Sequence, residues 1–383
     1  MQSNCIKPGN IFFWTGMLLQ LIYTGKIITI NSYEKSTYYV FLILVSFSVS
    51  IGMKRKHEKR EINLFIFLSL CAILHLFFTH DANLLRIVLM VFACKNIQSN
   101  AMKRYFAVIY PTFFATIVWL SLNTNFNPAY QEKIWRTSKG WELRWTLGFD
   151  GPTRMMFVWV CVIVSIQIYT GKMHKVRDIL FLFVSIFLYF LSDSNTGIIT
   201  SVMAIILPYT LKFFVMRITN LVLLYSVRIS LVIVLGLTIF ATMVDINSTW
   251  LGVFLNGRTG SLYWIFHSGY HPGLFGVEIP DGARGLDNSY YYCTYLLGIV
   301  PMFIMIVLIW RLGTVYWKNK DVMGTAALIT FISLAYVTQT FEHPYLNYIL
   351  FLVMENWRQI LGTDDEKSLT KKENRNRQFL VTI

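Results

Sequence analysis

Residues 229–244 read ISLVIVLGLTIFATMV, and this apolar run decides the class of fold. A helix that crosses the hydrocarbon core of a bilayer needs about 20 predominantly apolar residues. Comparable runs recur along the whole chain, so the sequence predicts an all-α, polytopic membrane protein with about twelve transmembrane helices. The expected apolar windows are 11–30, 36–53, 62–79, 82–94, 105–122, 154–171, 178–191, 196–211, 229–245, 289–310, 322–341 and 345–357.

The composition of the 383 residues supports the same class, because 55% of them are hydrophobic and only 14% are charged. An ordinary soluble domain has about 25% charged residues. One soluble core could not hide so many apolar side chains. The composition therefore excludes a soluble enzyme, a disordered protein and a single-span receptor. An outer-membrane barrel is also excluded, since its strands alternate between apolar and polar residues.

The net charge of +14 comes from basic clusters that lie between the apolar windows. Such clusters usually mark cytoplasmic loops, so we expect a topological role and no nucleic-acid partner. One orientation, with both termini in the cytoplasm and an even number of spans, places every cluster on the cytoplasmic side. The clusters are Lys54, Arg55, Lys56, Lys59 and Arg60; Lys95, Lys103 and Arg104; Lys172, Lys175 and Arg177; Lys212 and Arg217; and Arg311, Lys318 and Lys320.

The chain is expected to form one transmembrane domain over residues 1–357, followed by a polar cytoplasmic tail over residues 358–383. The first apolar window is predicted to be an uncleaved span. Two long connections, at about 123–153 and 246–288, are predicted on the opposite side of the membrane. They are rich in Gly, Pro and aromatic residues. Long connections in compact proteins are usually functional or disordered, and this composition favours ordered, functional loops.

Several kinds of chemistry have no signature in the sequence. It contains no phosphate-binding G-x-x-x-x-G-K-[ST] loop and no H-E-x-x-H or Cys-x-x-Cys pattern. The first outward connection holds one acidic residue, Glu34, instead of the paired acids that a metal-dependent transferase would place there. We therefore expect neither a metal nor a cofactor. Most of the five cysteines lie in apolar windows, so no disulfide framework is expected.

Three charged residues lie in or at the ends of apolar windows, where charge is expensive. Arg86 either extends toward the interface or contacts an anion or a carboxylate. Asp193 either belongs to a turn with a helix cap or contributes to a site, since Asp, Ser and Asn favour both turns and caps. Glu342, which precedes His343 and Pro344, either marks an interfacial break or has a functional role.

The first long connection carries positive charge on the side where topology does not favour it. It contains Arg144 and Arg154, together with further basic residues and three tryptophans. Anionic lipid headgroups would explain this charge, and so would a bound diphosphate. The planar guanidinium group can donate two hydrogen bonds to one phosphate group.

The second long connection gathers the strongest candidates for chemistry. It contains Arg258, His271, Arg284 and Asp287, separated by glycines that permit tight turns. Two cations, an imidazole and a carboxylate on one connection could bind an anionic leaving group and accept a proton.

With these residues the chain resembles the superfamily of O-antigen polymerases and O-antigen ligases. The resemblance rests on four stretches: Arg258 with Leu262, Asp287-Asn288 with Gly298, Arg144 with Leu147-Gly-Phe-Asp-Gly-Pro152, and Ser192-Asp-Ser-Asn-Thr-Gly197. It covers nearly the whole chain. Two positions depart from the family pattern. Asn195 stands where the turn often has Arg, and Asp287 stands where ligases have a histidine, which favours a polymerase over a ligase.

The resemblance implies a GT-C-like glycosyltransferase of the bacterial inner membrane, with both long connections in the periplasm. Its implied substrates are undecaprenyl-diphosphate-linked oligosaccharides, as donor and as acceptor, and a separate protein that regulates chain length is an implied partner. The product would be O-antigen, as part of lipopolysaccharide, or a capsule or exopolysaccharide. Arg258 and Arg284 are expected to bind the diphosphate, with further candidates Arg144, Arg154 and Arg86. Asp287 is the first choice of general base and His271 the second, with Glu342 and Asp193 as other candidates.

Three other functions remain open from the sequence. An O-antigen ligase would differ in its acceptor. A lipid-linked-sugar transporter or flippase would also be polytopic with intramembrane charges, although no symmetry between halves is visible. A membrane acyltransferase would need an early catalytic histidine, but His75 lies in the middle of an apolar window, where a packing role is expected.

Overall fold

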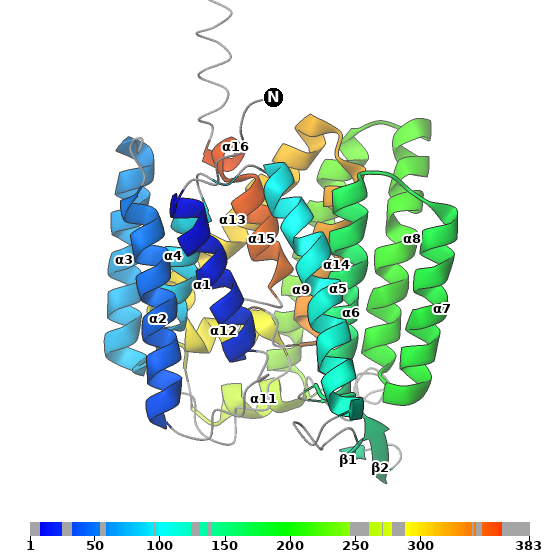
Figure 1. Ribbon diagram of the computed structural model, residues 1–383, viewed down its shortest axis with the longest axis horizontal. Helices are drawn as coiled ribbons and strands as arrows, with labels where there is room; N and C mark the ends of the chain where they lie inside the picture. Colours follow the sequence, from blue (N-terminus) through cyan, green and yellow to red (C-terminus); the bar gives the residue numbers. More distant parts are fainter. Residues whose placement is uncertain are drawn as a thin grey trace, which may run out of the picture.

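The fold is an assembly of helices that run between two ends of the molecule (Figure 1). A computed structural model of the chain describes residues 8–24, 33–53, 59–94, 97, 99–123, 131–136, 140–149, 151–245, 260–269, 271–277, 288–338, 341 and 347–361.

The first four helices form one group. They are α1 (Pro8–Thr24), α2 (Tyr33–Gly52), α3 (Lys59–Thr79) and α4 (Asn83–Ala93). These helices contact mainly one another. The short α4 lies inside the group, and all of its residues except Leu85 are buried. A helix that is apolar all round is expected to be enclosed by its neighbours.

The next five helices form a second group, with a β-hairpin inserted into it. They are α5 (Ser99–Asn123), α6 (Pro152–Thr170), α7 (Lys175–Ser192), α8 (Asn195–Arg217) and α9 (Leu221–Met243). The antiparallel strands β1 (Gln131–Arg136) and β2 (Gly140–Trp145) lie between α5 and α6, and Gln131 is paired with Trp145. Helix α6 is the most enclosed of these helices, because it packs against α5, α7, α8 and α14.

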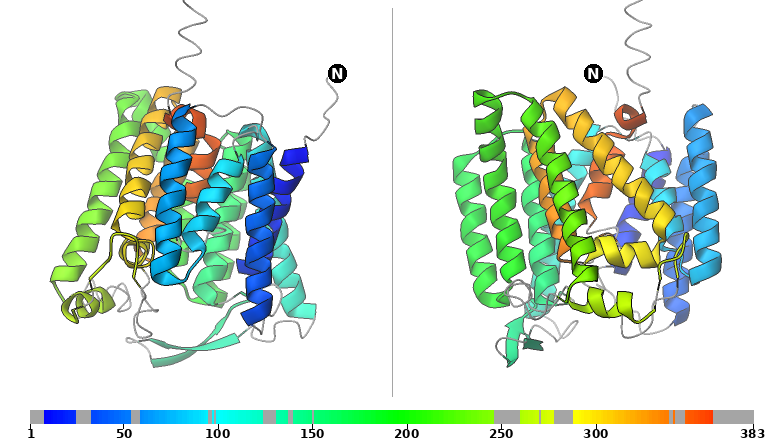
Figure 2. Two further views of the ribbon diagram at one scale, coloured as in Figure 1. Left: turned by 90° about the vertical axis from the view of Figure 1, so that its left-hand side faces the viewer. Right: turned by 180° about the vertical axis from the view of Figure 1, so that it is seen from behind.

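The last part of the chain consists of shorter and interrupted helices. They are α11 (Gly260–His267), α12 (Ser289–Leu296), α13 (Ile299–Asn319), α14 (Val322–Tyr336), α15 (Tyr348–Glu355) and α16 (Trp357–Leu361). Helices α11 and α12 lie across the direction of the long helices (Figures 1 and 2). At 1.5 Å per residue, α14 is about 22 Å long and α15 about 12 Å, so neither spans the roughly 30 Å core alone.

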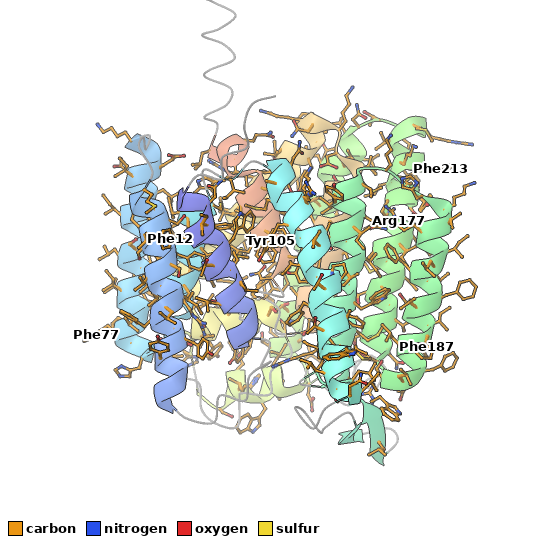
Figure 3. The ribbon with its side chains drawn as sticks, viewed as in Figure 1. Phe12, Phe77, Tyr105, Arg177, Phe187 and Phe213 are labelled. Carbon is orange, nitrogen blue, oxygen red and sulfur yellow. The ribbon has the colours of Figure 1, made fainter. Side chains whose placement is uncertain are left out.

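Six helices of the described residues are long and apolar enough to cross a membrane. They are Glu61–Thr79, Ser99–Asn123, Pro152–Thr170, Asn195–Arg217, Leu221–Met243 and Ile299–Asn319. Large apolar side chains also project from the outer surface, and Figure 3 shows Phe77 and Phe187 on opposite sides of the molecule. The chain is therefore an all-α membrane protein, as predicted. The count of about twelve spans stays a prediction.

The two ends of the assembly differ in their charge. One end, called here the basic end, carries most of the described members of the predicted clusters: Lys59, Arg60, Lys103, Arg104, Lys172, Lys175, Arg177, Lys212, Arg217, Lys318 and Lys320. Helix α1 begins and α16 ends at the basic end (Figure 1). The opposite end, called here the hairpin end, carries β1, β2, α11 and the turn at residues 192–195.

Candidate functional site

Arg144 lies on β2 at the hairpin end, just before a tight turn. Its side chain is 5% exposed, and in the hairpin its residue is paired with Glu132. The turn packs closely on α5, because a Cβ at Gly148, where φ is +84°, would lie 2.7 Å from the Cβ of Ser121. The Phe149 ring packs against aromatic rings of α5. The turn therefore holds the end of β2 against the bundle.

Arg154 lies in the first turn of α6, directly after this turn. The helix begins with Pro152, whose fixed φ suits the first helical position, and Gly151 before it has a φ of +106°. The Arg154 side chain is half-buried. Arg144 and Arg154 thus lie on either side of one turn, at the same end of the molecule.

Asp193 lies in the turn between α7 and α8. Its backbone is left-handed, with φ +45°, and its N–H donates to the Tyr189 carbonyl oxygen at 2.7 Å. The helix cap is its neighbour Ser194, whose Oγ accepts from the Gly197 N–H at 3.3 Å. The turn and the cap suggested by the sequence are thus both present. Because β2 contacts α7 and α6 contacts α8, Asp193 lies on an element next to those that carry Arg144 and Arg154.

Arg86 lies in a different part of the molecule. It is in α4, within the first helix group, and its side chain is 6% exposed. Asp81 precedes this helix and accepts from the Asn83 N–H at 2.9 Å. The candidate arginines that the structure describes therefore occupy two separate places, one in α4 and one around β2 and the start of α6 (Figure 1).

Of the remaining candidate site residues, the structure describes only His271. Arg258, Arg284, Asp287 and Glu342 lie outside the described residues. His271 is described and exposed, and its ring centroid lies 6.4 Å from that of Phe266 on α11. It begins a segment, residues 271–277, that returns toward the bundle.

This returning segment covers the break between α12 and α13. The Ile299 N–H donates to the Gly273 carbonyl oxygen at 3.1 Å, and the Val300 N–H donates to that of Leu274 at 3.1 Å. The first N–H groups of a helix have no partner within the helix, so the segment satisfies two of them for α13. The Val277 N–H donates to the Tyr295 carbonyl oxygen of α12 at 2.9 Å.

His75 joins the same segment to the first helix group. The side chain is fully buried, and its Nδ1 donates to the Phe275 carbonyl oxygen at 3.0 Å. The sequence predicts a packed histidine here, and the structure adds its partner, which is 200 residues away in the chain. No local pattern identifies such a partner.

Asn288 and Gly298 have structural roles at the start of α12 and at the start of α13. The Asn288 side chain accepts from the Tyr291 N–H at 3.0 Å and donates to Thr238 Oγ1 of α9 at 3.2 Å. Gly298 has a φ of +100°, and a Cβ there would lie 2.4 Å from the Gly276 nitrogen. Asn288 directly precedes α12, and Gly298 directly precedes α13.

An apolar cavity of about 70 Å³ lies where the first helix group meets the last helices. Leu68, Ile304, Met305 and Leu308 are half-exposed, so the cavity reaches the surface between α3 and α13. Arg86 directly precedes the lining residue Ile87 in α4 but is not itself one of the lining residues. The full lining is Leu68, Leu84, Ile87, Val88, Val91, Cys293, Leu297, Pro301, Met302, Ile304, Met305, Leu308, Phe341, Leu350, Val353 and Trp357.

Among the described residues, no three His, Cys, Asp or Glu side chains are close enough together to hold a metal ion. Comparison with protein families, curated proteins and solved structures finds no match for the chain. The fold and the charge distribution define an all-α membrane protein with a buried arginine, Arg144, at the hairpin end.

Proposed function

We propose that the chain is a glycosyltransferase that joins undecaprenyl-diphosphate-linked oligosaccharide repeat units into a longer glycan. The observation that carries the proposal is the burial of Arg144 at the hairpin end, opposite the basic end. A buried guanidinium group in a membrane protein is expensive, and such groups commonly mark substrate paths. In this proposal the basic end faces the cytoplasm and the hairpin end faces the periplasm.

The proposed reaction needs no nucleotide at the outer face. A hydroxyl oxygen of the acceptor repeat unit forms a bond to the anomeric carbon of the donor glycan. The bond from that carbon to the diphosphate oxygen breaks, and undecaprenyl diphosphate leaves with the electron pair. Asp287 or His271 accepts the hydroxyl proton. Negative charge grows on the leaving diphosphate, so the fixed cations Arg258, Arg284 and Arg144 stabilise the transition state.

The apolar cavity supports a substrate with a hydrocarbon chain. Its lining offers carbon and sulfur surface, and it reaches the surface between α3 and α13, where a lipid could enter from the side. In this proposal the cavity holds the start of the prenyl chain of the substrate.

Glycan length tests the proposal. We expect Arg144→Ala to lower the polymerisation rate by about 10²-fold or more, as removal of a group that stabilises transition-state charge commonly does. Arg217→Ala, at the basic end, is the matched control and should keep the normal length distribution. Glycans are to be compared by electrophoresis at equal membrane levels of each variant. Long glycans from correctly folded Arg144→Ala would overturn the proposal.

A second test concerns the metal-free mechanism. We expect the purified protein to extend lipid-linked repeat units equally well with and without a chelator of divalent cations. Activity that is lost on chelation and restored by one divalent ion would contradict the assignment of this role to arginines.

A transporter of lipid-linked sugars is the second candidate, and the interrupted helices favour it. Discontinuous helices inside a membrane bundle often form transport sites. Here α12 and α13 meet at a break, and α14 and α15 are both too short to cross the core alone. Proteoliposomes separate the two functions. A polymerase lengthens the glycan, whereas a transporter moves the lipid-linked unit across the bilayer and leaves its length unchanged.

A further inference from the structure

Arg228 is a charged residue within a membrane-spanning helix, outside the proposed active site. It lies seven residues after the start of α9, which corresponds to about 10 Å along the helix from the basic end. Its side chain is half-buried. An ionisable residue at such a depth is expected to have an electrostatic partner.

The Arg228 guanidinium lies over the ring of Trp310 in α13. Its Cζ is 4.5 Å from the ring centroid, which is the geometry of a cation–π interaction. The two helices approach closely at this level, because a Cβ at Gly313 would lie 2.9 Å from Val227 Cγ1. The close contact between α9 and α13 therefore fixes the position of the pair.

The charge of Arg228 is not balanced by a carboxylate among the described residues. Its Nε is buried and has no hydrogen-bond partner there. Other arginines near the basic end differ. Arg177 pairs with Asp178 at 2.8 Å, and Arg311 Nη1 donates to the Ile360 carbonyl oxygen at 3.4 Å. An aromatic ring attracts a cation but accepts no conventional hydrogen bond from it.

The surroundings of Arg228 open toward lipid. Trp310 is 39% exposed, and the apolar neighbours Tyr225 and Ile229 on α9 are more than half exposed. Tryptophan is enriched where a membrane protein meets the headgroup region. A lipid headgroup could therefore approach Arg228 from outside the protein.

We infer that Arg228 and Trp310 bind the phosphate group of an anionic phospholipid in the leaflet at the basic end. The guanidinium donates to the phosphate oxygens, and the Trp310 ring holds the guanidinium in place. The acyl chains then lie along the outer surfaces of α9 and α13. This site serves a structural lipid and is separate from the arginines toward the hairpin end.

Lipid binding in nanodiscs tests the site. We expect wild-type protein to retain phosphatidylglycerol over phosphatidylcholine in native mass spectrometry, and Arg228→Gln to weaken this retention about tenfold. Arg217→Gln is the matched control, since Arg217 also lies over a ring, that of Phe213 at 4.7 Å, but at the exposed end of α8. Equal retention by wild type and Arg228→Gln would overturn the inference.

Two further measurements keep the test decisive. Trp310→Leu retains the charge and removes the ring, so it should weaken phosphatidylglycerol retention by a few-fold even if Arg228→Gln fails to fold. Inorganic phosphate, added to protein in phosphatidylcholine nanodiscs, should leave the thermal stability unchanged. If phosphate stabilises wild type but not Arg228→Gln, the site binds free phosphate and the lipid assignment is wrong.

Discussion

Gly298 shows how one residue can determine a local arrangement. A side chain there would meet the Gly276 nitrogen, the Leu274 oxygen and the Phe275 Cα, all within 2.5 Å. The residue also has a left-handed φ of +100°, which favours glycine. The returning segment, α12 and α13 can meet only because this position lacks a Cβ.

Gly298→Ala is therefore expected to destabilise the protein by about 3 kcal/mol or more, through backbone strain and displacement of the segment. Gly236→Ala is the control, because a Cβ at Gly236 in α9 meets no atom within 4 Å. That variant should be neutral or slightly stabilising, since alanine is the better helix former. Thermal unfolding in detergent compares the two. A Gly298→Ala protein as stable as wild type would show that the segment does not pack as described.

His75 is the second residue with a long-range role. Removal of its ring leaves the Phe275 carbonyl oxygen without this donor inside the bundle, and a buried polar group without its partner costs about 1–3 kcal/mol. We expect His75→Leu to lower the unfolding midpoint. His80→Asn is the control, because His80 is exposed and its left-handed backbone tolerates asparagine. Hydrogen exchange should rise at residues 275–277 in His75→Leu, and an unchanged exchange rate would exclude the tether.

At the scale of elements, α15 is held by an ion pair as well as by packing. Lys103 Nζ of α5 lies 3.0 Å from Glu355 Oε1, and Ser99 Oγ donates to the same oxygen at 3.1 Å. The Glu355 side chain is only 11% exposed, so it depends on these partners. The pair connects the end of a short helix to a long one.

A double-mutant cycle tests this connection. Lys103→Met should lower the free energy of unfolding by about 1–3 kcal/mol, because it leaves a largely buried carboxylate without its cation. Adding Glu355→Leu should recover part of the loss. Arg104→Met, at the exposed neighbouring position, should have little effect. Strict additivity of the two single effects would show that the ion pair contributes nothing.

The sequence predicted the long helices better than the interruptions. The apolar window 154–171 corresponds to α6, and window 178–191 to α7, because a continuous apolar run has one stable form in lipid. Window 289–310 instead divides into α12 and α13. Its division depends on Gly298 and on hydrogen bonds from residues 273–277, which no periodicity within the window reveals.

The hairpin was also missed. Strands β1 and β2 lie in the first long connection, for which the sequence predicted order but no strand. The candidate site stays a prediction. Arg144 and Arg154 lie on either side of one turn, whereas Arg86 lies in the first helix group. Which residues of different elements lie close together depends on tertiary packing, and their spacing in the chain does not show it.

At the scale of the whole molecule, the charge difference between the ends predicts the orientation in the membrane, and labelling of single cysteines can measure it. The four cysteines of the described residues are buried. Once Cys5 is replaced by Ser, a new surface cysteine can therefore be labelled selectively. We expect His174→Cys at the basic end to react with a membrane-impermeant maleimide only after the cells are opened. Ser268→Cys at the hairpin end should react in spheroplasts whose plasma membrane is intact. The reverse pattern would contradict the orientation.

The separation of α1–α4 from the later helices has a consequence for how the protein is made. These helices contact mainly one another, and all four are complete once residue 93 has been synthesised. They can therefore assemble in the bilayer while the ribosome is still translating α5 and the helices after it. The apolar cavity lies between this early subassembly and the last helices to be inserted. All of its walls are therefore in place only when translation is nearly finished.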